Sequence, residues 1–229
     1  IDAFGGDYTA YMTRREIEEE MEALTAIREN QEGDEKKRAT ALRIAAIAKA
    51  AGDWGRVINE LTPFLATDNQ DVLRELGHAF CEEHRHSPMG SEYAQGQGYL
   101  QQAIEMAPGL PEAHALLAET WTRLPHEERK SRELYQTAFE ADPENPYNFA
   151  AFLEFELLFN HEKALFKLMA PSIRRAIEQC RTHTEIGIEL PRAFFTMGQL
   201  HILLGEPYES LTAYCKALQL CISDEAGAR

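Results

Sequence analysis

The segment Leu117-Ala118-Glu119-Thr120-Trp121 decides the fold, because its pattern returns along the chain. In it the large Leu117 is followed by the small Ala118, and the apolar residues have the spacing of one face of a helix. A second helical set follows at a fixed step: Ser131, Tyr135, Ala138 and Pro143. Two further pairs of sets repeat the pattern: Leu76-Gly77-His78-Ala79-Phe80 with Leu100, Ala103 and Pro108, and Phe194, Met197-Gly198 and Gly205 with Ser210, Tyr214 and Ala217. The repetition predicts helices that come in pairs, one pair after another.

The small residues of these sets have a physical purpose. Some remove a side chain where the second helix of the same pair must cross closely: Gly77, Ala118 and Gly198. Others do the same where the next pair packs: Ala103, Ala138 and Ala217. Strand signals are nearly absent, since valine occurs only at Val57 and Val72 and no stretch alternates apolar and polar residues over strand length. The chain is therefore expected to be all-α.

Proline and glycine mark the ends of the predicted helices. Pro108 and Pro143 should each end a second helix, because proline cannot donate a backbone hydrogen bond and disfavours helical geometry in the residue before it. Gly52-Asp53-Trp54 and Gly205-Glu206-Pro207 are predicted to be tight turns between paired helices. Residues 84–90 form a polar insertion with Pro and Gly between the two helices of one pair.

This pattern resembles the tetratricopeptide repeat, whose period is 34 residues. The resemblance implies an all-α, right-handed superhelical solenoid of antiparallel helix pairs. It divides the chain into an N-terminal segment with a capping helix, about five hairpins and a short tail. The expected ranges are 1–37 for the N-terminal segment, 38–69, 70–110, 111–145, 146–190 and 191–224 for the hairpins, and 225–229 for the tail.

Some stretches depart from the repeat. The range 146–190 is irregular, because bulky Leu153 stands where a small residue is expected and Pro171 should split the second helix, with Ser172 as a new N-cap. The first hairpin is weak, with Ala41 and Ala48 at positions that usually carry large residues. Before it, a capping-box pair and an apolar stripe predict a helix over about 13–30.

Composition limits the partners. The chain has 229 residues, 44% of them hydrophobic, and 23 basic against 38 acidic residues give a net charge of −15. That charge disfavours nucleic acids and anionic membrane surfaces, and no apolar run approaches the roughly 20 residues of a membrane span. Four cysteines without a CxxC pair are expected to be reduced thiols in a cytoplasmic protein. Since the chain begins at Ile1, we expect it to be a fragment of a longer polypeptide or a processed form.

No catalytic signature stands out, so we expect no enzyme activity and no cofactor. The densest group of ligand types is Cys81-Glu82-Glu83-His84-Arg85-His86. It could serve a metal or small-ligand sensor, but it has no second ligand pair at zinc-finger spacing and Arg85 opposes a cation, so a charged helix end is favoured and no metal site is predicted. His114 and His201 are expected to pack in the core.

The resemblance places a partner on the concave face, which is lined by the first helix of each pair. The positions that correspond in this chain are Arg43, Lys49, Arg74, His78, Glu119, Glu154, Phe195 and Gln199, with Glu75 beside them. Arg43, Arg74 and His78 could form a small positive spot for an acidic peptide, although ordinary solvation of exposed Arg is the alternative. One subset of the family grips the C-terminal carboxylate of chaperones, but Leu42 and Ala46 stand at the corresponding positions and cannot bind a carboxylate.

Two functions of different classes remain open. The leading one is a protein-interaction module or scaffold that binds a peptide or a neighbouring domain in the groove. The alternative is a regulatory or sensor arm of a larger signalling or defence enzyme whose catalytic domain lies elsewhere. In addition, Leu218 and Ile222 on the last helix lack a polar cap, which suggests either a continuation of the array or self-association through the terminal helix.

Overall fold

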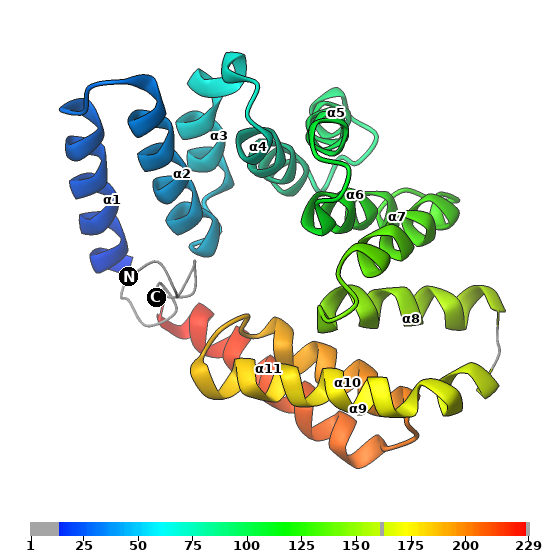
Figure 1. Ribbon diagram of the computed structural model, residues 1–229. Coiled ribbons are helices and arrows are strands. Elements are labelled where there is room, and N and C mark those ends of the chain that lie inside the picture. The colour runs from blue at the N-terminus through cyan, green and yellow to red at the C-terminus, as the bar shows by residue number, and fades with distance from the viewer. Residues whose placement is uncertain (1–13, 161–162, 228–229) are drawn as a thin grey trace. The chain divides into compact units, whose positions relative to one another are not determined.

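The computed structural model describes residues 14–160 and 163–227, and every regular element among them is helical (Figure 1). The prediction of an all-α fold of antiparallel helix pairs is confirmed. The elements are α1 (Arg14–Glu29), α2 (Asp34–Ala50), α3 (Trp54–Leu61), the 3-10 helix η2 (Thr62–Thr67), α4 (Gln70–Glu83), α5 (Ser91–Met106), α6 (Pro111–Thr122), α7 (Glu128–Ala141), α8 (Pro146–Asn160), α9 (Lys163–Ile186), α10 (Arg192–Leu203) and α11 (Pro207–Gly227).

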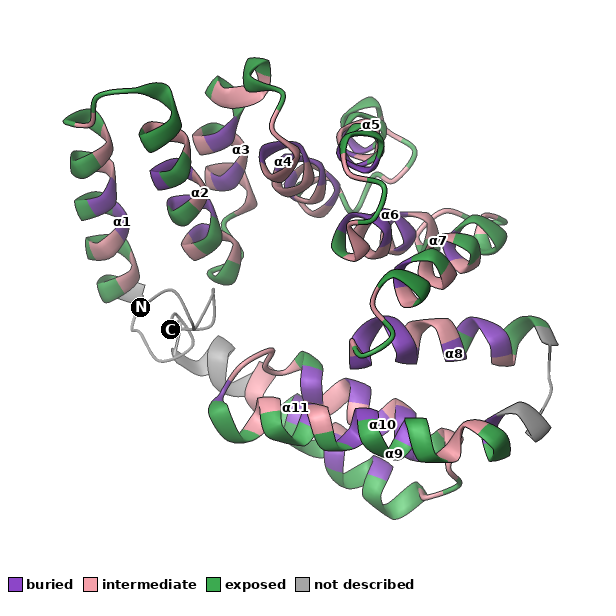
Figure 2. Cartoon of the chain, viewed as in Figure 1, coloured by how far each residue is buried: buried purple, intermediate pink, exposed green. Residues whose placement is uncertain are grey.

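The helices form two compact units that divide within α7, after Leu134. In the first unit, each helix from α1 to α6 packs on the next one along the chain. Its core is a row of fully buried residues that includes Ile44, Leu61, Leu76 and Leu100 (purple in Figure 2). Packing of each hairpin on its sequence neighbours is the pattern of a helical-repeat array.

The second unit begins at Tyr135 and contains α8 to α11. The ring of Phe139, near the end of α7, lies 5.3 Å from that of Phe149 and 4.9 Å from that of Phe152, so aromatic contacts join α7 to α8. Leu153 is fully buried in the same core, together with Leu200 of α10. The helix α9 packs more extensively on α10 than on α8.

The predicted break at Pro171 is wrong. Residues 163–186 form one helix with Pro171 inside it, so Ser172 is a helical residue and not a new N-cap. An internal proline costs about 3 kcal/mol because it removes a hydrogen bond and crowds the preceding turn. Ile173, Ile177 and Cys180 follow it at helical spacing and are all buried, and this burial offsets the cost.

Most predicted helix limits agree with the structure. The expected N-terminal helix is α1, although Thr13 of its capping box lies outside the described residues. Two α-helices fall in each of the ranges given above for the five hairpins, but α2 begins at Asp34, before the first range, and α11 ends at Gly227, after the last. As predicted, α5 and α7 end just before Pro108 and Pro143. Gly52 and Gly205 have positive φ angles of 72° and 75° at the predicted tight turns.

Two glycines allow α4 and α5 to cross closely, as the pattern predicts for Gly77. A Cβ atom at Gly77 would lie 2.7 Å from the carbonyl oxygen of Gly96 and 2.7 Å from Cγ of Leu100. A Cβ atom at Gly96 would lie 2.7 Å from Sγ of Cys81. Gly198 has the same role in the second unit, where a Cβ atom would lie 2.8 Å from the ring of Tyr214.

Alanine at Gly77 and at Gly98 should have opposite effects on stability. Gly77→Ala forces a methyl group against backbone, so we expect the free energy of unfolding to fall by about 2 kcal/mol. Gly98 lies in the same hairpin with no atom within 4 Å of its Cβ position. Gly98→Ala should raise the free energy of unfolding by about 0.5–1 kcal/mol through helix propensity alone. Urea denaturation measures both, and a stabilising Gly77→Ala would contradict the close crossing.

Candidate interaction face

The first helices of successive hairpins lie beside one another within each unit. In the first unit α4 contacts both α2 and α6, and in the second unit α10 contacts α8. We call these surfaces the α2–α4–α6 face and the α8–α10 face. Every site residue that the sequence predicts belongs to one of these five helices: Arg43, Lys49, Arg74, His78, Glu119, Glu154, Phe195 and Gln199.

Glu75 is the centre of an ion-pair cluster between α2 and α4. Its carboxylate accepts a hydrogen bond from Lys49 Nζ at 2.9 Å and lies 3.1 Å from Arg74. Arg74 also lies 3.0 Å from Asp71. Burial disfavours the charged form of Glu75, but Lys49 and Arg74 outweigh it and lower the pKa of this carboxyl. Glu75 is therefore ionised at neutral pH and ties α2 to α4.

The structure gives the predicted positive spot a different composition. Arg74 is engaged by two carboxylates, and the ring of His78 packs edge-on against Trp54 with centroids 5.1 Å apart. Arg43 is exposed on α2. Glu75 and Asp71 thus balance Lys49 and Arg74, and of the predicted spot Arg43 is the exposed arginine.

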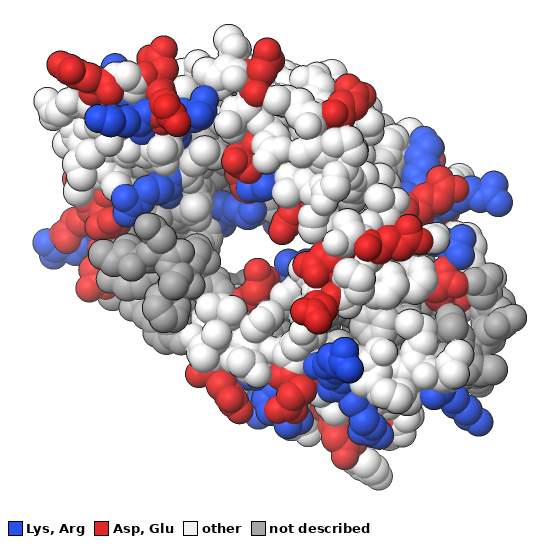
Figure 3. All heavy atoms as spheres, viewed as in Figure 1, with Lys and Arg blue, Asp and Glu red and all other residues white. Residues whose placement is uncertain are grey.

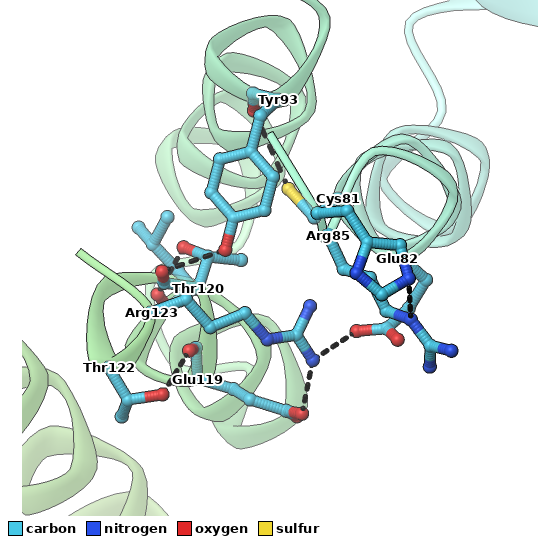
Figure 4. Close-up of polar contacts among 10 residues, drawn as sticks. Cys81, Glu82, Arg85, Tyr93, Glu119, Thr120, Thr122 and Arg123 are labelled. Atoms are coloured by element: carbon cyan, nitrogen blue, oxygen red, sulfur yellow. Dashed lines mark hydrogen bonds and ion pairs between the residues drawn. The ribbon is translucent and has the colours of Figure 1, made fainter. Parts of the chain in front are cut away.

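A second bridge joins α4 to α6 (Figure 4). Arg123, just after α6, forms ion pairs with Glu82 of α4 and with Glu119 of its own helix. Beneath the bridge, the buried hydroxyl of Tyr93 donates to the carbonyl oxygen of Thr120 at 2.8 Å. No sequence signal singles out the bridge between Arg123 and Glu82, because the two residues are 41 positions apart.

The α8–α10 face is joined in a similar way. Gln199 Nε2 donates to the carboxylate of Glu154 at 2.8 Å, which connects two residues that the sequence predicts as partner-binding. The ring of Phe195 lies 6.2 Å from that of Tyr214 on α11. Burial, together with the charge of Glu154, raises the pKa of Tyr214, so this phenol is neutral at physiological pH.

The ligand-rich run 81–86 does not gather around one point. Cys81 is buried with its Sγ 3.6 Å from the carbonyl oxygen of Tyr93, and burial raises the pKa of this thiol to about 12. Glu82 is held by Arg123, whereas Arg85 and His86 are exposed. In the part of the chain that the structure describes, no group of three or more His, Cys, Asp or Glu side chains could hold a metal ion.

The remaining titratable candidates pack as the sequence predicts. All four cysteines are free thiols. His114 is buried, with Nε2 2.8 Å from the carbonyl oxygen of Pro108. His201 is buried as well, with Nδ1 2.8 Å from Glu206. Both histidines therefore contact residues of the turns between helices, Pro108 and Glu206.

Comparisons with known proteins give likeness in structure alone. No family model and no curated protein matches the chain. The solved structures that resemble it include a crystal structure of MamA protein, with 16% identity over 80% of this chain and 91% of that one and a TM-score of 0.42. Another, named MamA MSR-1 C2, has 16% identity over 82% of this chain and 95% of that one and a TM-score of 0.45. Identities and scores this low leave function to be inferred from the chain's own residues.

Among the described residues, no helix combines the length and the apolar character that crossing a bilayer would require.

Removing the charge of Glu75 should weaken the fold in a pH-dependent way. Because the pKa of Glu75 is lowered on folding, its ion pairs stabilise the protein above its unfolded pKa of about 4.3, and this contribution is lost as pH falls through the folded pKa. At pH 7 we expect Glu75→Gln to reduce the free energy of unfolding by about 1–3 kcal/mol. Below pH 4 the difference from wild type should shrink.

Urea titrations at several pH values measure this difference. Glu105→Gln, at an exposed site on α5, is the matched control and should change stability by less than about 0.5 kcal/mol. A loss for Glu75→Gln that stayed constant from pH 7 down to pH 3 would show that the charge of Glu75 is not what stabilises the cluster.

Proposed function

We propose that this chain is a protein-interaction module, a scaffold that binds a peptide or a neighbouring domain on its first-helix faces. The observation that supports it best is the bonding between first helices: Lys49 to Glu75, Arg123 to Glu82, and Gln199 to Glu154. These bonds hold side chains from separate hairpins in fixed positions. Binding to side chains that are already ordered costs less conformational entropy, so such a face is suited to recognition.

The basic side chains of α2 and α4 favour an acidic partner on that part of the α2–α4–α6 face. Asp71 and Glu75 balance Lys49 and Arg74 there, and Arg43 adds an exposed positive charge on α2, whereas the whole chain has a net charge of −15. Elsewhere basic and acidic side chains are interspersed, as Figure 3 shows for one side of the molecule. An acidic segment would therefore be repelled over most of the chain and attracted here, where Arg guanidinium groups form strong hydrogen bonds to carboxylates.

A reducing setting is part of the proposal. The four thiols are free, and two of them, Cys81 and Cys180, are fully buried. Free buried thiols are typical of cytoplasmic proteins. We accordingly place the interaction module in the cytoplasm, where it would act as a scaffold or as the regulatory arm of a larger polypeptide.

A charge reversal on the proposed face should abolish the preference for acidic peptides. Peptides selected on the immobilised 229-residue chain from a random display library should be enriched in Asp and Glu. Arg43→Glu should weaken their affinity at least tenfold, because it reverses the charge of an exposed side chain on α2. Fluorescence anisotropy with labelled peptides measures the dissociation constants.

The matched control is Arg129→Glu, which reverses another exposed arginine, on α7, a second helix. It makes the same change in net charge away from the face and should leave affinity within about twofold. Equal losses in the two variants would mean that only net charge matters. Selected peptides that bind Arg43→Glu as well as wild type would contradict the proposed site.

A further inference from the structure

The helix α11 has an apolar stripe on its exposed side. Tyr208, Leu211 and Leu218 are 82%, 62% and 52% exposed, and Cys215 between them is exposed too. Steps of three, four and three residues place these four side chains along one narrow line of the helix. We call them the α11 stripe. Ile222, which the sequence also suggests, lies outside the residues whose side chains are described.

The opposite side of α11 is used for packing within its own hairpin. Ser210, Ala213 and Ala217 are buried there. Tyr214 meets Gly198 of α10, where the two helices cross closely. The stripe therefore takes no part in packing α11 against α10.

The register of the repeat shows what normally covers such a surface. Leu218 follows Ala217, just as Ile104 follows Ala103 in α5 and Phe139 follows Ala138 in α7. Ile104 is buried in one core with Leu117 of the next first helix, α6. Phe139 packs on rings of the next first helix, α8. Leu218 occupies the matching position on α11 but is half exposed, so the stripe has the character of a helix-docking surface.

Charge favours a second copy of this chain as the occupant. When two identical helices pair about a two-fold axis, the residues near the axis face their own copies, so any charge there would repel itself. The central residues of the stripe and their neighbours, 211–215, read Leu-Thr-Ala-Tyr-Cys and have no charge. Lys216 is directed to the other side of the helix, with Nζ 5.5 Å from the centre of the Phe194 ring. The whole chain has a net charge of −15, so two copies repel each other in general. The uncharged centre of the stripe lets them approach there without a direct contact between like charges.

We propose that the α11 stripe pairs with the α11 stripe of a second copy in antiparallel orientation. The alternating three- and four-residue spacing is that of the seam between two coiled helices. Antiparallel pairing sets bulky Tyr208 against Leu218 and sets Leu211 against the small Cys215, each contact occurring twice. It also aligns the two helix dipoles favourably. One stripe offers less area than the roughly 800 Å² per partner of a standard interface, so the dimer is weak, with a dissociation constant in the micromolar range.

Sedimentation velocity across about 5–300 μM tests the pairing. The weight-average mass of the wild type should rise with concentration from 26.0 kDa towards twice that value. Leu211→Glu should remain monomeric throughout, because it buries an unpaired charge from each copy in the apolar seam. The matched control is Leu168→Glu on α9, which adds the same charge at a leucine that is 79% exposed, and it should dimerise like the wild type. Circular dichroism confirms that all three chains are equally helical.

A wild type that stays at 26.0 kDa would overturn the proposal and leave a helix of another protein, or of a longer form of this chain, as the occupant. Dimers that Leu211→Glu does not weaken would overturn it too, since another surface would then join the copies. Both results are independent of the first-helix faces, because Arg43→Glu should leave dimerisation unchanged.

The orientation has its own test. In an antiparallel pair, Leu211→Cys places a new thiol opposite Cys215 of the other copy. Mild oxidation with copper phenanthroline should then link this variant into covalent dimers at least ten times faster than the wild type. Leu211→Cys combined with Cys215→Ser should lose that acceleration. Equal rates in the wild type and in Leu211→Cys would rule out the antiparallel pairing.

Discussion

The close crossing of two helices at a small residue is the constraint on which the hairpins α4–α5, α6–α7 and α10–α11 depend. At Gly77 the backbones of α4 and α5 approach so nearly that a single methyl group would collide with a carbonyl oxygen. At Ala118 the small side chain lets Ser131 Oγ donate to the backbone carbonyl at 3.0 Å, and at Gly198 the ring of Tyr214 fills the space. Because close packing leaves no room for adjustment, these contacts fix the position of one helix against the other in each of these pairs.

Fixed hairpins in turn determine which side chains meet between hairpins. With α4 packed on α5, Glu75 of α4 forms an ion pair with Lys49 of α2. Glu82 of α4 forms an ion pair with Arg123, just after α6. These ion pairs contribute modestly to stability, because each is partly exposed. Their larger effect is to order a polar face. The helix α11 is different, since Tyr208, Leu211 and Leu218 leave an apolar stripe exposed on it.

Much of this fold could be predicted from local patterns. Helical spacing, Pro108, Pro143 and the turn at Gly52 are signals carried by neighbouring residues, and the structure agrees with each of them. Pro171 shows the limit of such reasoning. A proline opposes a helix locally, yet burial of Ile173 and Cys180 against other helices holds α9 continuous. The helices that carry the candidate residues could be predicted, whereas the ion pairs these residues form within the chain could not, and their binding of a partner stays a prediction.

By itself the sequence determined the all-α class, the paired helices and the small residues at their crossings, because these follow from spacing within about 35 residues. Only the tertiary structure decided that Arg74 is engaged by Asp71 and Glu75, that Arg123 reaches Glu82, and that Leu211 and Leu218 remain exposed. The physical reason is that ion pairing and burial depend on which distant segments meet. Contacts between distant segments depend on the packing of the whole fold, so they cannot be predicted from a short stretch of sequence.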